Sequence, residues 1–104
     1  MIGKKITLAG KERELRFTLN VMETVEELTG KNALTQNIFD DLSAKNIRAI
    51  LYAYLQDDEE LTIKDVGAMV DPGNLEEVIK VMMEAYNDSV PKSDGNKKKG
   101  KVSQ

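Results

Sequence analysis

The stretch SAKNIRAILYAYL, residues 43–55, has the strongest structural pattern in the chain. Five large apolar residues recur in it at the i, i+3, i+4, i+7 and i+8 spacing of a buried helix face: Ile47, Ile50, Leu51, Tyr54 and Leu55. Ser43 can cap the first turn, because a serine hydroxyl accepts a hydrogen bond from a free backbone N–H. We expect this helix to lie at the centre of the fold.

The segment before this helix predicts a β-hairpin. Polar and apolar side chains alternate in residues 5–8 and 14–17, and Gly10 lies in the turn between them. The alternation puts four apolar side chains on one face: Ile6, Leu8, Leu15 and Phe17. An isolated hairpin is only marginally stable in water, so this face must pack against helices.

A second helix is predicted between Thr18 and Gly30. Thr18 can cap its first turn, and Gly30 supplies the left-handed residue that commonly ends a helix. Its expected buried stripe is Leu19, Met22, Val25 and Leu28. Residues 33–42 then predict a short helix or turn that inserts three apolar side chains into the core: Leu34, Ile38 and Phe39.

Two further helices are predicted after residue 60. Thr62 and Asp65 have the spacing of a capping box, which begins a short helix over residues 63–70. A turn at residues 71–73 precedes a last helix, capped by Asn74. The apolar stripe of this helix is Leu75, Val78, Ile79, Met82 and Tyr86. The predicted fold class is therefore α+β and mostly helical, with an N-terminal hairpin packed on four to five helices.

The chain changes character at Pro91. Residues 1–90 carry 10 Lys/Arg against 17 Asp/Glu, a net charge of −7, whereas residues 91–104 carry five lysines against one aspartate, a net charge of +4. The last stretch offers only Val102 to a core, so burial gains too little to offset its ordering entropy. We expect one folded domain over residues 1–90 and a disordered basic tail over residues 91–104.

The composition excludes most catalytic chemistry. The absence of cysteine and histidine excludes zinc sites built on these residues, thiol chemistry, and Ser-His or Cys-His catalytic pairs. The acidic run at residues 57–60 does not fit a calcium loop, because the positions that need glycine and glutamate hold Thr62 and Ala68. Adjacent carboxylates such as Glu26 and Glu27 diverge by about 100° on a helix. We expect no enzyme, no metal site and no cofactor.

Four side chains are candidates for contact with a protein partner: Tyr52, Met69, Met83 and Tyr86. Methionine is flexible and polarisable, and it lines adaptable binding grooves as well as ordinary cores. Tyr52 and Met83 are displaced from the main apolar stripes of their helices. Packing in the core and contact with a partner both stay open as interpretations of these four side chains.

The sequence favours a soluble protein of the cytoplasm. The N-terminus has no apolar stretch long enough for a signal peptide, and no window approaches the roughly 18 apolar residues of a membrane span. The acidic domain argues against specific nucleic-acid binding, and the lysines of the tail give at most weak, salt-sensitive attraction. We expect neither a membrane nor a specific nucleic acid among the partners.

Several strings of the sequence together resemble one family. After the opening hairpin they are FTLN at residues 17–20, ELTGK at 27–31, LYAYL at 51–55, LTIKDV at 61–66, GNLEEVI at 73–79 and AYNDSVP at 85–91. In this order, over residues 4–91, the chain resembles the small tail assembly chaperones of long-tailed phages and prophages of Gram-positive bacteria.

The resemblance implies a protein that acts in the bacterial host cytoplasm and is absent from the mature virion. Such a chaperone binds the long tape measure protein, keeps it soluble, and is released as tail tube subunits polymerise around it. The family also commonly makes a longer form by ribosomal frameshifting. The implied partners are therefore the tape measure protein, the tail tube protein and a frameshifted longer form of this chain. Slippage favours A-rich codons, which Lys97, Lys98 and Lys99 can supply.

Two other functions stay open. One is a small helical regulator or adaptor that binds another protein, and the other is a structural tail component such as a connector or tube subunit. A chaperone gene should lie just upstream of a very long helical reading frame, and a regulator's gene should not. A structural subunit should be present in purified particles. The sequence does not indicate the oligomeric state.

Overall fold

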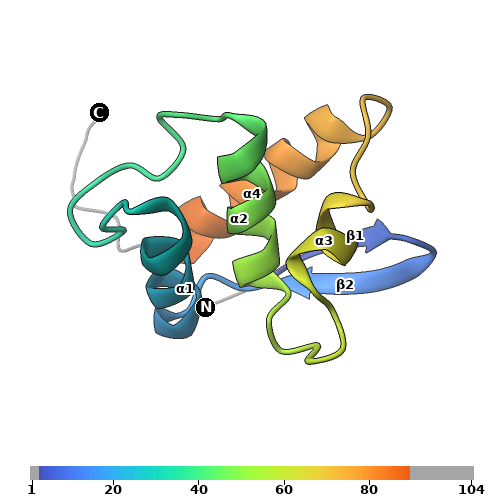
Figure 1. Ribbon diagram of the computed structural model, residues 1–104, viewed down its shortest axis with the longest axis horizontal. Helices are drawn as coiled ribbons and strands as arrows, with labels where there is room; N and C mark the ends of the chain where they lie inside the picture. Colours follow the sequence, from blue (N-terminus) through green and yellow to red (C-terminus); the bar gives the residue numbers. More distant parts are fainter. Residues whose placement is uncertain (1–2, 90–104) are drawn as a thin grey trace.

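The computed structural model describes residues 3–89, and it has the expected α+β class. A hairpin of two strands, β1 (Lys4–Leu8) and β2 (Lys11–Leu15), comes first along the chain. Four helices follow: α1 (Leu19–Thr29), α2 (Ala44–Tyr54), α3 (Ile63–Gly67) and α4 (Leu75–Ser89). Figure 1 shows α2 in the middle of the molecule, with α1 on one side and α3 and the hairpin on the other. The predicted tail, residues 91–104, lies outside the described residues.

The hairpin turns over two residues, Ala9 and Gly10. Both have a positive φ, 53° and 77°, as a tight hairpin turn between twisted strands requires. Leu8 therefore pairs with Lys11, and the second strand covers residues 11–15. The predicted second strand, residues 14–17, overlaps β2 only at residues 14 and 15, because a two-residue turn returns the chain earlier. The predicted apolar face is confirmed, since all four of its side chains are buried: Ile6, Leu8, Leu15 and Phe17.

An arginine shares the inner face of the hairpin. Arg13 is paired with Ile6 across the strands, and its side chain is only 11% exposed. Its Nε donates to the Leu8 carbonyl at 3.4 Å, and its Nη1 lies 3.4 Å from Asp58 Oδ2. The guanidinium of Arg13 thus contacts both the hairpin and Asp58, and it connects the hairpin to the loop that follows α2.

The core is built around α2, as the sequence predicts. Seven of its residues are buried, including Ile50 and Leu51. The Ser43 hydroxyl accepts a hydrogen bond from the Asn46 N–H, so the predicted cap is confirmed. α1 and α3 pack against α2, while α4 packs across both strands of the hairpin. The Tyr54 hydroxyl donates to the Met82 carbonyl at 2.9 Å and joins the end of α2 to α4.

Two leucines predicted to be buried are exposed. Leu19 is 68% exposed and Leu34 is 74% exposed. α1 packs against α2, and its buried residues are Val21 and Val25, one turn apart. Leu19, the first residue of the helix, lies on the opposite face and therefore points outward. Residues 33–42 form turns without a helix, and only two of the three expected side chains, Ile38 and Phe39, are buried.

α3 is shorter than predicted. The capping box is confirmed, because Thr62 Oγ1 accepts from the Asp65 N–H and the Asp65 carboxylate accepts from the Thr62 N–H, each at 3.0 Å. The helix ends at Gly67, three residues before the predicted end. Ala68 already closes it by donating to the carbonyls of Lys64 and Asp65. This early end leaves residues 68–74 as an irregular connection to α4.

Candidate protein-binding site

A largely apolar groove of about 340 Å³ lies between α2, α3 and the start of α4. We call it the central groove. Its lining comes from three helices and the connections before them: Leu42, Ala44, Ile47, Arg48, Leu51, Val66, Gly67, Val70, Asp71, Pro72 and Leu75. Concave apolar sites with few polar groups are the usual binding sites for apolar side chains.

The floor and the rim of the central groove differ in burial. Ile47, Leu51 and Val66 form the floor and belong to the core. Leu42, at 36% exposed, and the half-buried Val70 stand at the edge. The floor is therefore fixed by folding, and the rim is free to meet a partner.

A glycine of α3 leaves room for an arginine side chain of α2. A Cβ placed on Gly67 would lie 2.9 Å from Arg48 Cδ, which is closer than side chains tolerate. The missing side chain lets the stem of Arg48 lie against α3. The arginine thus forms part of the groove wall, and its CH₂ groups add apolar surface to that wall.

Two charged residues line the central groove, and only one of them is engaged. Asp71 Oδ1 accepts hydrogen bonds from the N–H groups of Gly73 at 2.8 Å and Asn74 at 3.2 Å. Within residues 3–89, the guanidinium of Arg48 makes neither a hydrogen bond nor an ion pair, and the residue is exposed. The groove can therefore bury apolar side chains of a partner. The guanidinium of Arg48 at its wall has no hydrogen-bond or ion-pair partner among residues 3–89.

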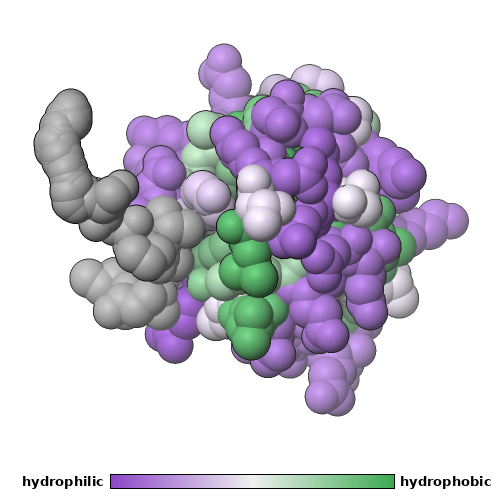
Figure 2. Space-filling view, turned by 90° about the vertical axis from the view of Figure 1, so that its left-hand side faces the viewer, coloured by the Kyte–Doolittle hydropathy of each residue, from purple (hydrophilic) through white to green (hydrophobic). Residues whose placement is uncertain are grey.

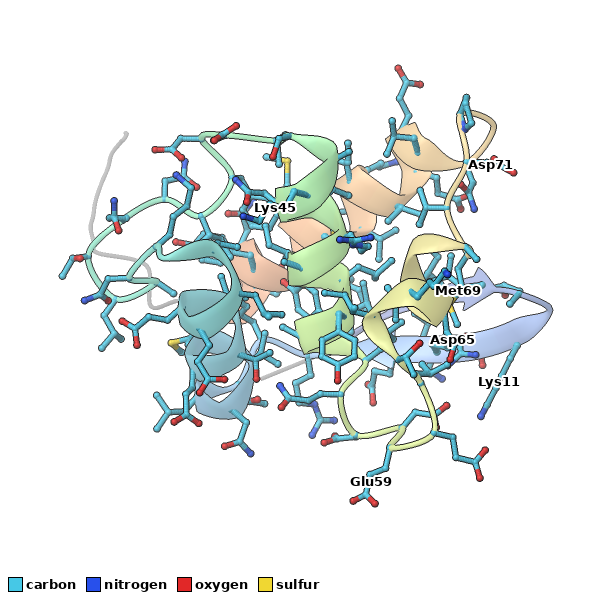
Figure 3. The ribbon with its side chains drawn as sticks, viewed as in Figure 1. Lys11, Lys45, Glu59, Asp65, Met69 and Asp71 are labelled. Atoms are coloured by element: carbon cyan, nitrogen blue, oxygen red, sulfur yellow. The ribbon has the colours of Figure 1, made fainter. Side chains whose placement is uncertain are left out.

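The four candidate partner residues do not meet at one place. None of them lines the central groove. Tyr52 is half-buried and lines a separate hollow with Leu28 and Leu61. Met69 is half-buried on the segment between α3 and α4, where Figure 3 labels it below Asp71.

The other two candidates lie on α4 in different surroundings. Met83 is 38% exposed. Tyr86 is half-buried and packs edge-on against two rings, with centroid distances of 4.9 Å to Phe17 and 5.4 Å to Phe39. These contacts give Tyr86 a place in the packing of the domain, and contact with a partner stays a prediction for all four. Lys97, Lys98 and Lys99 lie outside the described residues.

Among residues 3–89, two titratable groups have shifted pKa values, and both shifts have structural causes. Burial, followed by the neighbouring Tyr86, raises the pKa of the Tyr54 phenol well above 10.0. Hydrogen bonds from the backbone and side chain of Thr62 lower the pKa of Asp65 below 3.8. One group bonds α2 to α4 and the other caps α3, so both are accounted for by the fold.

The described residues offer neither a metal site nor a helix that could cross a membrane. In the part of the chain from residue 3 to residue 89, no three carboxylates gather where they could hold a metal ion. None of the helices described there is long and apolar enough to cross a membrane.

Comparisons with protein-family models, curated proteins and solved structures give no match. The central groove is thus the strongest guide to function that the chain itself offers. Sequence reasoning missed it because its rim residues, Leu42 and Val70, lie outside the helical stripes and in two separate segments. The one signal was a pair of apolar residues at helix boundaries, Leu42 before a cap and Val70 before a turn.

Proposed function

We propose that this chain is a tail assembly chaperone of a long-tailed phage or prophage. It binds the tape measure protein in the cytoplasm of the bacterial host before the tail tube polymerises, and it is absent from the mature virion. The observation that carries the proposal is the central groove, a preformed apolar site on an otherwise charged domain. The family resemblance of residues 4–91 supplies the identity of the partner.

The groove suits transient shielding of amphipathic helices. Long helical proteins expose apolar stripes before assembly, and such stripes cause aggregation. A helix laid on the central groove buries side chains against Leu42, Val70 and Leu75, while the net charge of −7 on residues 1–90 keeps the complex soluble. A groove of about 340 Å³ holds only a few side chains, so release by polymerising tube subunits is compatible with it.

The test is co-expression with the long helical protein encoded next to this gene. We expect the tape measure protein to become soluble and to copurify with the chain. Ala44→Glu should abolish both effects, because Ala44 is exposed and lines the groove, so the change places a carboxylate there. Glutamate in the first turn of α2 favours the helix, so the variant should remain folded.

Gln36→Glu is the matched control. It adds one negative charge away from the groove, and its side-chain oxygen can still accept from the Asn32 N–H, as Gln36 does at 2.7 Å. An unchanged solubility of the tape measure protein with the wild-type chain would refute the proposal. Detection of the chain in purified virions would point to a structural tail component instead.

A further inference from the structure

The two most exposed large apolar side chains among residues 3–89 share one hollow. Leu19 and Leu34 both line a depression of about 300 Å³ beside α1, with Met22 and Ala33 packed on the core beneath. We call this region, with Asn20, Glu23, Glu26 and Asn32, the α1 surface. Figure 2 looks onto this side of the molecule and shows hydrophobic side chains near its middle among hydrophilic ones. Single exposed leucines are common, but a converging pair indicates a contact site.

The backbone under both leucines is fixed. The Leu34 N–H donates to Asn32 Oδ1 at 2.9 Å, and the Asn32 carbonyl accepts from the Gln36 N–H at 2.8 Å. Leu19 begins α1, where Thr18 Oγ1 accepts from the Val21 N–H at 3.3 Å. The pair is therefore held in place before any partner arrives, which lowers the entropy cost of binding.

One side of the α1 surface is acidic. Glu23 and Glu26 line the same hollow, and both are exposed. Neither forms an ion pair with any residue of the described range 3–89. From Leu19 to Glu26 the axis of α1 rises about 10 Å, or two helical turns. Apolar and negative contacts thus follow one another along a single helix.

We propose that the α1 surface binds an amphipathic helix of another protein that carries apolar side chains followed by lysine or arginine. Two turns of such a helix reach both leucines and both glutamates. The helices of this chain do not fit, because α1 and α4 carry more acidic than basic residues and the apolar face of α2 is buried. None of these three helices of a second copy is therefore the occupant, and the occupant is a helix of another protein.

The α1 surface is separate from the central groove. The two sites share no lining residue. Ala44→Glu should therefore leave binding at the α1 surface unchanged, and the failure of one proposal does not affect the other. A chain with both sites can bind two helical segments of partner proteins at once.

The test uses the full chain and two synthetic helical peptides. One peptide has leucines on one face and lysines on the other, and its twin has glutamate at every lysine position. Fluorescence anisotropy should show binding of the lysine peptide only. Leu19→Ser with Leu34→Ser should weaken this binding at least tenfold, whereas Met83→Ser, a change at an exposed apolar side chain elsewhere, should leave it unchanged.

A charge pair separates the site from general attraction to an acidic protein. Glu23→Gln with Glu26→Gln should weaken binding several-fold and reduce its dependence on salt. The matched control, Glu59→Gln with Glu60→Gln, removes two exposed charges from the loop before α3 and should change binding less than twofold. Equal effects of the two glutamate pairs, or unchanged binding after loss of both leucines, would overturn the proposal.

Discussion

The hydrogen bond from Tyr54 to α4 can be tested by removing a single oxygen atom. The phenol is buried and donates to the Met82 carbonyl at 2.9 Å. Tyr54→Phe removes this bond and leaves the packing of the ring against Phe17, at a centroid distance of 5.9 Å, in place. We expect the free energy of unfolding at neutral pH to fall by about 1 kcal/mol, the usual net value of one such bond.

The same tyrosine should make the wild-type protein sensitive to alkali. Because its folded pKa is raised above the unfolded value of 10.0, the folded state holds the phenolic proton more tightly. The stability gained from this proton is complete below the unfolded pKa and is lost as the pH rises towards the folded pKa. The loss approaches about 1.4 kcal/mol per pH unit in that range. The variant has no phenol to titrate, so its stability should overtake that of the wild type roughly half to one pH unit above 10.

Urea denaturation followed by circular dichroism, over a pH series that passes 10, measures both effects. Groups common to the two proteins cancel in the difference between wild type and Tyr54→Phe. Tyr52→Phe, which removes a half-buried hydroxyl from the same helix, should cost less at neutral pH. A difference between wild type and Tyr54→Phe that stays constant through alkaline pH would refute the buried, protonated hydrogen bond described above.

Five further substitutions test the fold. Ile50→Ala should lower the free energy of unfolding by about 2 to 5 kcal/mol, and Leu34→Ala by less than about 0.5 kcal/mol, in urea denaturation; similar costs would contradict the observed burial. Gly30→Ala should cost about 1 kcal/mol in thermal unfolding, because φ is 78° at the end of α1. Thr62→Ala should cost about 1 kcal/mol through the lost cap of α3. The lowered pKa of Asp65 means that its contribution is present above pH 3.8 and is lost as the pH falls through that lowered pKa. Below pH 3.8, the free energy of unfolding of Asp65→Asn should therefore depend less steeply on pH than that of the wild type.

Local signals predicted three of the four helix caps. The predicted side-chain cap at Asn74 was wrong, because its Oδ1 accepts from the Asp71 N–H at 2.8 Å and not from an N–H of α4. Thr18, Ser43 and Thr62 all accept a hydrogen bond from the N–H three residues later, as their side-chain chemistry indicates. Gly30 adopts the left-handed conformation expected at the end of a helix. Such features depend on residues close in sequence, so the sequence alone is sufficient for them.

Features that depend on packing direction were harder to predict. Leu19, Met22 and Val25 fit a helical stripe, but Val21 and Val25 fit one equally well, and only the approach of α2 decides between them. The α1 surface exists because that choice left Leu19 outside. The central groove depends on the distance between α2 and α3, and the stem of Arg48 lies against Gly67 at its wall. Hydrophobic periodicity contains neither the distance between two helices nor the direction from which one approaches the other.

The packing of α4 on the hairpin has a consequence for how the domain is made. The first element of the chain rests against the last, and Lys4 Nζ lies 3.1 Å from Asp88 Oδ2. During translation part of the apolar face of the hairpin stays uncovered until α4 emerges, and a two-stranded hairpin does not persist alone. We therefore expect nascent chains that stop before α4 to lack protection from proteases, and the domain to fold in one late step.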